Sequence, residues 1–487
     1  MFPWKSTLTI NTTSATPIYL QIANNIIRLI SSGQLTKGHK IPGSRTLSEL
    51  LEVNRKTVIQ AYDELTAQGW LYSHPARGTF VNDSLPIITP IPLQNKSTHD
   101  DINPKPDHST FNFIPAYSPQ PLNTIEINDG SPDHRLAPID WIYKECKSLS
   151  KTRHGKLLHK YNDVKGDETL RKELVKYLAE TRGMNITSDH ILITRGSQMG
   201  IFLIASISLQ ASDYAVVGDS SYDAADWTIQ YTGATLQRIT VDQEGLNTDE
   251  LERFCKNHPV RLVYITPHHH FPTTVTLSNH RRIKLLELSL KYNFTIIEDD
   301  YDYDFHYSSS PMLPLASLNH QAHVAYIGSF SKIFAPSIRV GYITAHPKLI
   351  NELTKLRRIV DRQGDPLLER VIAESITSGE LTRHLKKTIR EYKSRRDHFC
   401  KLLKSQLGDY TNFKIPEGGM AVWTNFNEKV KLRQALAKAN DHGIAVNIDK
   451  QHIRKFNAMR LGFASLNHEE AQIAIGKLSE IIKQSAF

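Results

Sequence analysis

A lysine flanked by hydroxyl groups is the first feature of this 487-residue chain that points to covalent chemistry. Lys332 ends the segment Gly328–Lys332 (GSFSK), which follows a predicted buried strand, and Arg339 comes seven residues later. A lysine amine forms a Schiff base with an aldehyde cofactor, and Ser329 and Arg339 are groups that hold a phosphate. The pattern indicates a cofactor site, with an ordinary surface loop as the alternative interpretation.

A second cluster is acidic and lies in Ile296–Phe305 (IIEDDYDYDF). Asp299 stands at the end of a predicted strand, where a carboxylate keeps a pyridinium nitrogen protonated and makes the ring an electron sink. Because Asp300, Asp302 and Asp304 alternate, a metal site is the rival interpretation. A calcium loop of the EF-hand type needs glycine at its sixth position, and phenylalanine stands there, so we predict no metal.

Two further loops follow predicted strands. Gly196, Ser197 and Gln198 (in TRGSQ) stand at a strand-to-helix turn, where glycine permits a close backbone approach and the helix N-terminus offers N–H groups to a phosphate. The other loop is Thr266–Thr273 (TPHHHFPT), whose three histidines suggest a metal. An extended chain places only the first and third histidines on one side, and no acidic residue or cysteine is adjacent, so we favour a plain loop.

These clusters follow short apolar segments that alternate with amphipathic stretches such as Arg281–Tyr292. This alternation is typical of a doubly wound α/β sheet, in which ligands bind at the carboxyl ends of the strands. The clusters therefore indicate one site at one edge of the sheet. The predicted strands are Ile191–Thr194, Ala215–Val217, Leu262–Ile265, Phe294–Ile297, Val324–Ile327 and Val340–Thr344.

The N-terminal residues predict a separate module. An apolar stripe at helical spacing begins after Pro17 and ends at Gly33, a second helix begins at Ser44, and Asn54 is a good N-cap for a third. Two short helices joined by a tight turn match the helix-turn-helix layout, and the alternating segments that follow predict a wing with Arg77 at its tip. A plain three-helix interaction domain is the alternative.

Charge and proline content divide the chain. Residues 1–82 hold eight basic residues against four acidic ones, which is consistent with binding a phosphate backbone or with a merely soluble basic surface. Residues 83–124 hold eight of the 23 prolines and predict an extended linker. We therefore expect a head at residues 1–82, a linker at 83–124 and a body at 125–487.

Composition excludes several classes of protein. Forty per cent hydrophobic and 22 % charged residues are ordinary for a globular chain, and no apolar run approaches the roughly 18 residues that cross a bilayer. The first residues show no apolar signal segment. Cys146, Cys255 and Cys400 lie far apart, which argues against a disulfide framework and a cysteine zinc site. We predict a cytoplasmic protein with no membrane partner.

Nearly the whole head resembles the GntR family of winged-helix regulators. The family pattern G-x-L-x-x-G-x-x-L-P-S-x-R is present from Gly33 to Arg45, with Gly43 where serine is usual. In that family the arginine of this pattern, the start of the recognition helix and the wing contact DNA. The resemblance implies that double-stranded DNA is contacted by Arg45, Arg55, Lys56, Thr57 and Arg77.

The body, from about Asn128 to Ile482, resembles the class I aminotransferases, which are fold type I enzymes of pyridoxal 5'-phosphate (PLP). The resemblance implies a mostly parallel, doubly wound sheet with a small C-terminal α/β subdomain. It also implies that Lys332 forms the Schiff base with PLP and that Asp299 pairs with the pyridine nitrogen. The other implied cofactor residues are Tyr301 at the ring hydroxyl, Tyr222 stacked on the ring, and Gly196, Ser197, Gln198, Ser329 and Arg339 at the phosphate.

Two more residues follow from the same resemblance. Tyr161 matches a tyrosine that reaches the phosphate of the neighbouring subunit, which implies a dimer, and Arg460 matches an arginine that clamps a substrate carboxylate. The sequence departs from the family at Ser220–Ser221, where Pro-Gly is usual, and at Thr274, where glycine is usual. Phe271 replaces an asparagine that contacts the ring hydroxyl, which we expect to weaken transamination more than cofactor binding.

A GntR-type head joined by a long linker to such a body is similar to the MocR (GabR-like) regulators. This resemblance implies a head-to-tail homodimer in which the cofactor and a small amine or amino-acid effector alter binding to promoter DNA. Three functions stay open: this ligand-responsive regulator, a sensor of PLP itself that controls vitamin B6 genes, and a genuine aminotransferase with an accessory head. The sequence identifies neither the effector nor the target genes, and leaves activation, repression and catalytic turnover open.

Overall fold

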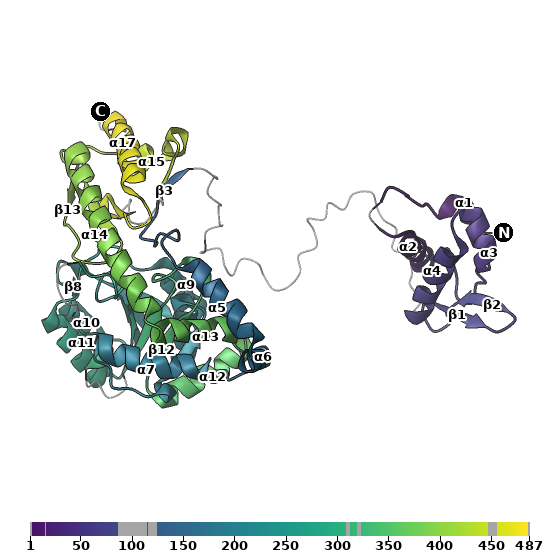
Figure 1. Cartoon of the computed structure of the whole chain (residues 1–487), viewed down its shortest axis with the longest axis horizontal. Coiled ribbons are helices and arrows are strands. Elements are labelled where there is room, and N and C mark those ends of the chain that lie inside the picture. The colour runs from purple at the N-terminus through teal and green to yellow at the C-terminus, as the bar shows by residue number, and fades with distance from the viewer. Residues whose placement is uncertain are drawn as a thin grey trace. The chain divides into compact units, whose positions relative to one another are not determined.

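The computed structural model describes residues 2–14, 16–85, 114, 124–307, 312–318, 323–446 and 455–485. The chain divides into two compact units, one within Met1–Thr110 and the other within Phe111–Phe487 (Figure 1). The predicted linker at 83–124 lies almost wholly outside the described residues, so its limits stay a prediction. No helix in the described ranges is both long enough and apolar enough to span a bilayer.

The first unit is a winged helix-turn-helix. The apolar stripe predicted from the sequence is buried, with Ile22, Leu47 and Leu65 fully covered in its core. The third predicted helix begins where expected, because the Asn54 side chain accepts a hydrogen bond from the Lys56 backbone N–H at 2.9 Å. The elements are α1 (Trp4–Thr7), α2 (Ile18–Ser31), α3 (Ser44–Leu51), α4 (Arg55–Ala67), β1 (Leu71–His74) and β2 (Gly78–Val81).

Helix α1 was not predicted, because four residues are too few to reveal a helical period. Its Trp4 is buried, and the ring lies 4.7 Å from Phe2 and 6.4 Å from His39 between centroids. An ion pair between Lys5 and Glu52 adds little at this exposed position. The residues before α2 therefore extend the core of the head.

The second unit is built on a seven-stranded sheet in the order β4-β12-β11-β10-β9-β5-β6. Strand β12 runs antiparallel to both neighbours, and the other adjacent pairs are parallel. All six predicted strands are present, whereas the edge strand β6 (TLQRI) was missed because its residues are mostly polar and half-exposed. The strands are β4 (Ile191–Thr194), β5 (Tyr214–Gly218), β6 (Thr235–Ile239), β9 (Val260–Ile265), β10 (Thr295–Asp299), β11 (Val324–Ser329) and β12 (Gly341–Thr344).

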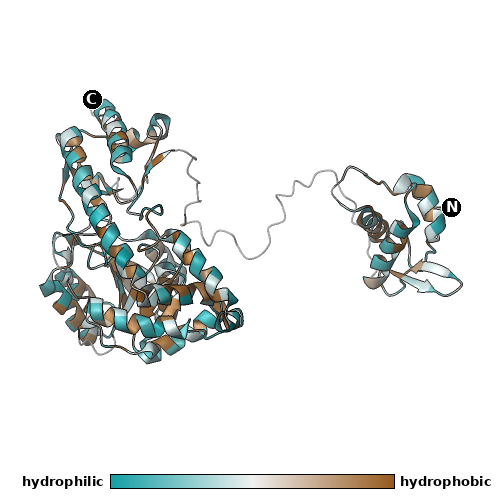
Figure 2. Cartoon of the chain, in the orientation of Figure 1, coloured by the Kyte–Doolittle hydropathy of each residue, from teal (hydrophilic) through white to brown (hydrophobic). Residues whose placement is uncertain are grey.

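Helices cover both faces of this sheet. On β10, Ile297 packs in the cluster formed with α8, α9 and α12, whereas its neighbour Ile296 packs on the opposite face with α10 and α11. The helices alternate hydrophilic and hydrophobic residues along their turns, as Figure 2 shows. The helices are α5 (Ile139–Lys151), α6 (Arg153–Leu158), α7 (Glu168–Arg182), α8 (Ser197–Ser208), α9 (Asp223–Tyr231), α10 (Thr248–Cys255), α11 (Asn279–Tyr292), α12 (Pro347–Val360) and α13 (Pro366–Thr377).

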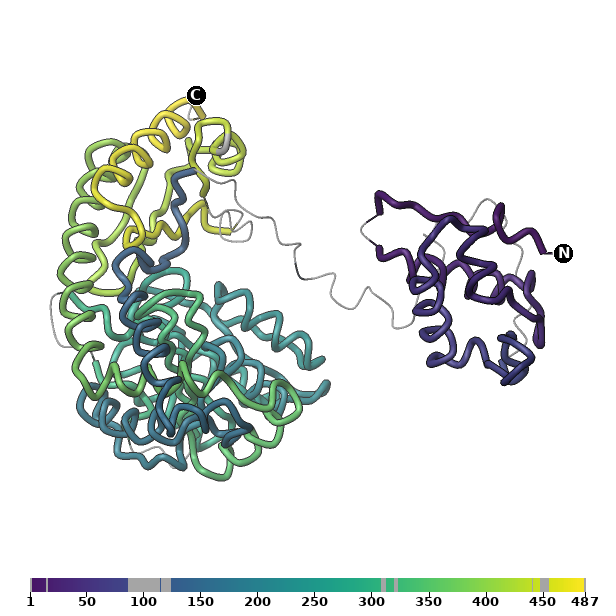
Figure 3. The backbone as a smooth tube through the Cα atoms, turned by 45° about the vertical axis from the view of Figure 1, so that its right-hand side comes forward, coloured from purple at the N-terminus to yellow at the C-terminus, as the bar shows by residue number. Residues whose placement is uncertain are grey.

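A smaller C-terminal subdomain follows the long helix α14 (Glu380–Leu407) and confirms the predicted fold class. Strand β3 (Ile125–Ile127), at the start of the body, pairs in parallel with β15 (Ile444–Val446), so the body begins beside its C-terminal segments (Figure 3). The remaining elements are β7 (Val241–Asp242), β8 (Gly245–Leu246), β13 (Thr411–Phe413), β14 (Ala421–Phe426), α15 (Leu432–Ala437), β16 (Ala458–Gly462), α17 (His468–Ser485) and the 3-10 turns Ser188–His190, Leu315–Ser317, Pro336–Ile338 and Asn440–His442.

The cap on α4 makes a testable contribution to the stability of the head. Replacing Asn54 by alanine removes the acceptor for the Lys56 N–H, which costs about 1 kcal/mol. We expect the buried amides of α4 to exchange with deuterium about fivefold faster in the full-length Asn54→Ala variant, as measured by mass spectrometry. The Gln60→Ala variant, changed at an exposed position of the same helix, is the control. Unchanged exchange in Asn54→Ala contradicts this role.

Candidate cofactor and DNA-binding sites

The carboxyl ends of the parallel strands surround a cavity of about 230 Å³. It brings together five of the predicted cofactor residues, which lie at the end of β10 or in the segments after β4, β5, β10 and β11. Asp129 and Tyr264, which line it too, were not singled out from the sequence. The lining residues are Asp129, Ser197, Tyr222, Tyr264, Phe271, Asp299, Tyr301 and Lys332.

Lys332 extends into this cavity from the turn after β11. Its ammonium group donates a hydrogen bond to the backbone oxygen of Gly130 at 2.8 Å. Burial lowers the pKa of Lys332, the nearby carboxylate of Asp129 raises it, and the guanidinium of Arg460 lowers it, with a net shift below the usual value. A lowered pKa favours the neutral amine, which is the nucleophilic form that reacts with an aldehyde.

The Asp299 carboxylate has an oxygen that can accept a hydrogen bond from a protonated pyridine nitrogen. One carboxylate oxygen, Oδ2, accepts a hydrogen bond from the Tyr264 hydroxyl at 2.9 Å, while Oδ1 is buried and has no hydrogen-bond partner among the described residues. Burial raises the pKa of Asp299 to about 7, against the lowering effect of the Tyr264 hydrogen bond. A buried carboxylate oxygen without a partner fits the protonated ring nitrogen of PLP, whose charge favours the carboxylate form.

Arg460 lies beside the cavity but is already engaged by protein oxygens. Its guanidinium donates to the backbone oxygens of Asp129 (2.7 Å) and Pro272 (3.0 Å) and to the Tyr301 hydroxyl (3.2 Å). It also lies 5.1 Å from the Phe271 ring centroid. The Tyr301 hydroxyl in turn donates to the backbone oxygen of His269 at 3.0 Å. Arg460 therefore holds the loop and Tyr301 in place besides facing the site.

The predicted phosphate-binding residues gather at the amino end of α8. Gly196 has a φ of 79°, and a side chain there would bring its Cβ within 2.9 Å of the Arg339 guanidinium. That guanidinium donates to the backbone oxygen of Arg195 at 2.7 Å. Ser329 is buried, whereas Gln198 is exposed. A helix N-terminus with an arginine beside it suits an anion, so this end of the site fits the phosphate of PLP.

Two predicted tyrosines have different settings. Tyr222 precedes α9, and its ring meets the edge of Phe271 at 5.6 Å between centroids and 74° between planes. Ser221, where the family usually has glycine, donates a hydrogen bond to Asp226 of the same helix. Tyr161 is 78 % exposed, outside the cavity of its own chain, with the Arg362 guanidinium 4.2 Å from its ring centroid. Its predicted role in a partner subunit stays a prediction.

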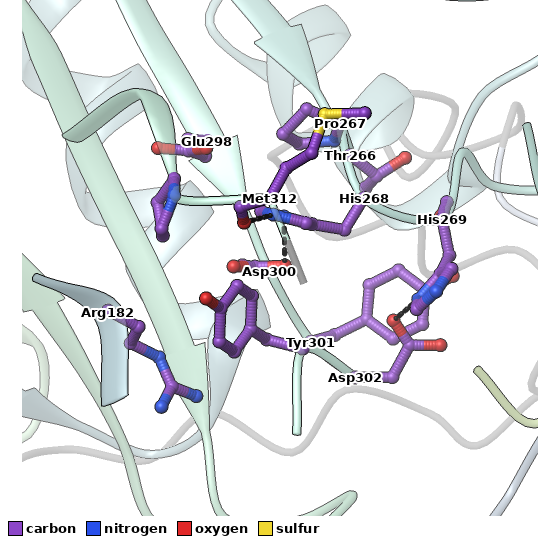
Figure 4. A network of polar contacts seen from close by, with 12 residues as sticks. Arg182, Thr266, Pro267, His268, His269, Glu298, Asp300, Tyr301, Asp302 and Met312 are labelled. Atoms are coloured by element: carbon purple, nitrogen blue, oxygen red, sulfur yellow. Dashed lines mark hydrogen bonds and ion pairs between the residues drawn. The ribbon is translucent and has the colours of Figure 1, made fainter. Parts of the chain in front are cut away.

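The histidine loop differs from our expectation, because its acidic partners come from the neighbouring strand end. His268 Nδ1 lies 3.0 Å from Asp300 Oδ1, and His269 Nδ1 lies 2.8 Å from Asp302 Oδ1 (Figure 4). The Tyr326 hydroxyl also donates to Asp300, at 3.0 Å. The two histidine–aspartate pairs are 32 and 33 positions apart in the chain, so no local pattern revealed them. The described residues contain no cluster of three potential metal ligands.

The predicted DNA-contacting residues lie at the surface of the head. Arg55 and Lys56 are exposed in the first turn of α4, Thr57 is half-buried beside them, and the Arg55 guanidinium donates to the Ser44 hydroxyl at 3.3 Å. Arg45 is exposed in α3, and Arg77 is exposed in the turn between β1 and β2. Their contacts with DNA stay a prediction.

Comparisons with known proteins divide the chain in the same way. Residues 18–81 match the family model of the bacterial regulatory proteins of the gntR family, and residues 125–478 match that of aminotransferase class I and II. The uncharacterized HTH-type transcriptional regulator YdfD of Bacillus subtilis is 29 % identical over 483 residues, which cover 96 % of this chain and 97 % of that protein.

Two further proteins are similar, one to nearly the whole chain and the other to its body. The probable rhizopine catabolism regulatory protein MocR of Rhizobium meliloti is 24 % identical, and the match covers 95 % of this chain and 93 % of that protein. The crystal structure of Pyrococcus horikoshii kynurenine aminotransferase in complex with PMP has a TM-score of 0.69 and 28 % identity. The match covers 74 % of this chain and 91 % of that one.

The buried Asp299 predicts a pH dependence of stability in the cofactor-free protein. Because its pKa is about 7 in the fold and 3.8 in the unfolded chain, the fold binds this proton more tightly. The resulting stabilisation is lost as the pH rises through 7. Relative to Asp299→Asn, we expect the wild type to lose roughly 2 kcal/mol of unfolding free energy between pH 5.5 and 7.5.

Calorimetric melting of the full-length proteins at both pH values measures this difference. The variant Asp409→Asn, changed at an exposed carboxylate of the body, is the control and keeps the wild-type pH profile. Parallel profiles for the wild type and Asp299→Asn would show that Asp299 titrates like an exposed aspartate.

Proposed function

The chain belongs to the aminotransferase class I and II family, and from this premise we propose that it is a PLP-dependent, ligand-responsive regulator of transcription. One observation carries the proposal: the same chain joins a winged helix of the gntR family to a cavity in which Lys332 and Asp299 offer the groups that PLP requires. Relatives named as transcriptional regulators match both parts of it. A role on DNA is consistent with a cytoplasmic protein.

We assign PLP to this cavity by chemical fit. The unpartnered Asp299 oxygen would face the ring nitrogen, Tyr301 the ring hydroxyl and Tyr222 one side of the ring. When bound, PLP would supply an aldehyde carbon that bonds to a primary amine. The Lys332 amine could then be exchanged there for an incoming primary amine, with two hydrogens passing to the lysine nitrogen and no change of oxidation state. Lys332 therefore serves as the group that an effector amine displaces. The phosphate would lie against Gly196, Ser197, Gln198, Ser329 and Arg339.

The effector is a small amine or amino acid in this proposal. A carboxylate on it would meet Arg460, whose guanidinium already donates to three protein oxygens beside the cavity. Control of transcription requires that the effector bind two states of the protein with different affinity. A coupling free energy of about 1–3 kcal/mol changes DNA affinity by roughly 5–150-fold.

A head-to-tail homodimer is part of the proposal. Tyr161 is exposed and stacked under Arg362, away from its own cavity, which suits a residue that completes the phosphate site of a partner subunit. Each head would then contact promoter DNA through three places: Arg45 in α3, the first turn of α4 with Arg55, Lys56 and Thr57, and Arg77 in the wing.

A second candidate is an aminotransferase that turns over. The lysine, the carboxylate and the ring-facing tyrosine share one cavity, and the fold matches a structure named as an aminotransferase. Phe271 lines that cavity where an asparagine is usual, so the ring hydroxyl has one hydrogen-bond donor fewer and turnover is disfavoured. Steady production of a keto acid from an amino donor and a keto acceptor would favour this candidate. A sensor of PLP itself would change its DNA affinity between the apo and holo forms without any amine.

The Lys332→Ala variant tests the covalent route. We expect its body to fold, because among the described residues the lysine makes a single hydrogen bond, to a backbone oxygen. We expect DNA affinity to persist while the 5–150-fold response to effector amines disappears. Fluorescence anisotropy of labelled promoter DNA, with and without an amine mixture, measures both quantities. Lys355→Ala, changed at an exposed lysine of the body, is the control. An undiminished response in Lys332→Ala would rule out displacement of this lysine as the switch.

The Arg55→Ala variant tests the recognition helix. Loss of one phosphate contact reduces the slope of log affinity against log salt concentration by about 1 and weakens binding to all sequences alike. The matched control is Arg28→Ala, because Arg28 is exposed in α2 and is not among the predicted contacts. Binding titrations at several salt concentrations measure these slopes. Equal slopes for the wild type and Arg55→Ala would show that Arg55 does not contact a DNA phosphate.

A further inference from the structure

Asp129 lines the cofactor cavity, but neither the sequence pattern nor the proposed chemistry assigns it a role in binding the cofactor or the effector. It sits in a rigid turn directly after β3. The Asn128 side-chain oxygen accepts hydrogen bonds from the backbone N–H groups of Gly130 (3.0 Å) and Ser131 (2.9 Å), and its amide donates to the Ser465 hydroxyl at 2.8 Å. The turn therefore holds the Asp129 side chain at a fixed place on the cavity wall.

Lys332 and Arg460 both donate hydrogen bonds to backbone oxygens of this turn. The backbone oxygen of Asp129 accepts from Arg460 at 2.7 Å, and that of Gly130 accepts from Lys332 at 2.8 Å. The cations thus bind the main chain of the turn rather than the Asp129 carboxylate. Within the described ranges, that carboxylate forms no hydrogen bond or ion pair, although it is half-buried.

The charge of Asp129 nevertheless acts across the cavity. It raises the pKa of Lys332, of Tyr222 and of Tyr301, which surround the same space. With Lys332 bonded to PLP and Asp299 at the ring nitrogen, Asp129 would be the lining carboxylate that has no cationic partner among the described residues. A cation brought by a ligand into this partly water-excluded cavity would attract that carboxylate more strongly than it would at an open surface.

We propose that Asp129 selects the effector by charge, so that the ligand carries a second cationic group besides the amine that meets PLP. The ligand class is a diamine or a basic amino acid. The inference rests on the proposed function, because it concerns the effector of that same cavity. The first amine of the ligand replaces Lys332, and its second, protonated amine pairs with the Asp129 carboxylate.

Matched ligand pairs test this assignment. Isothermal titration calorimetry on the full-length, PLP-loaded protein compares α,ω-diamines of three to five carbon atoms with the monoamines of equal length, and lysine with norleucine. We expect the wild type to bind at least one dicationic ligand with an affinity at least about tenfold higher than that for the matched ligand without the second amine. Preference within the diamine pairs identifies a diamine, and preference within the lysine pair a basic amino acid.

Two variants separate charge selection from other roles. Asp129→Asn keeps the shape and the backbone oxygen that Arg460 uses, so it should fold, load PLP and bind both members of each pair equally. Asp409→Asn, the same change at an exposed carboxylate elsewhere in the body, should keep the wild-type preference. Circular dichroism and the PLP absorbance verify folding and loading.

Three results would overturn the inference. Equal binding within every pair by the wild type removes charge selection and leaves the amine-responsive regulator intact. Equal weakening of monoamines and diamines in Asp129→Asn means that Asp129 acts on Lys332 instead. If no amine binds the loaded wild type or changes its DNA affinity, the proposed function itself fails along with the inference.

Discussion

The body of this protein depends on charged groups buried at the carboxyl edge of its central sheet. Asp299 is 3 % exposed with one unpartnered oxygen, and the Lys332 amine shares its cavity. Such groups destabilise a fold unless a ligand complements them, and they cluster where a protein binds one. In the proposed function, a cofactor with a ring nitrogen, an aldehyde and a phosphate would meet these needs together. Its binding to the folded state would then add to the stability of the body.

The cavity is assembled from two parts of the body. Lys332 follows β11 and Asp299 ends β10, both in the large sheet, whereas Arg460 and the turn after β3 belong with the C-terminal subdomain. The hydrogen bond from Lys332 to Gly130 already joins these parts at 2.8 Å. Bonding of Lys332 to PLP would remove that hydrogen bond, and an effector that displaces the lysine would make contacts of its own. In the proposed function, the small subdomain would be the element whose position responds to the ligand, because a regulator needs such an element to change the state of its DNA-binding heads.

Most of this fold could be predicted from the sequence because the hydrophobic periodicity and the residues at element ends were clear. The Asn54 cap predicted the start of α4, the apolar stripe predicted α2, and six short apolar segments predicted strands. Failures had specific causes: α1 is too short to show a period, and β6 is a polar edge strand. The same holds for the site. Lys332 and Asp299 lie next to strand ends, whereas Asp129 enters through a distant turn, and the partners of His268 and His269 lie on a neighbouring strand end. Contacts that the topology creates leave no local signal.

In the proposed function, this chain reads specific DNA sequences under the control of an occupied cofactor site. The most direct test is to incubate the PLP-loaded full-length protein with fragmented genomic DNA at a stated salt concentration and to sequence the fragments that it retains. We expect a small set of discrete sites, enriched beside genes of amine or amino-acid metabolism, that remains bound as salt increases. Weak, salt-sensitive retention of fragments with no sequence in common would contradict this function and would favour the aminotransferase candidate.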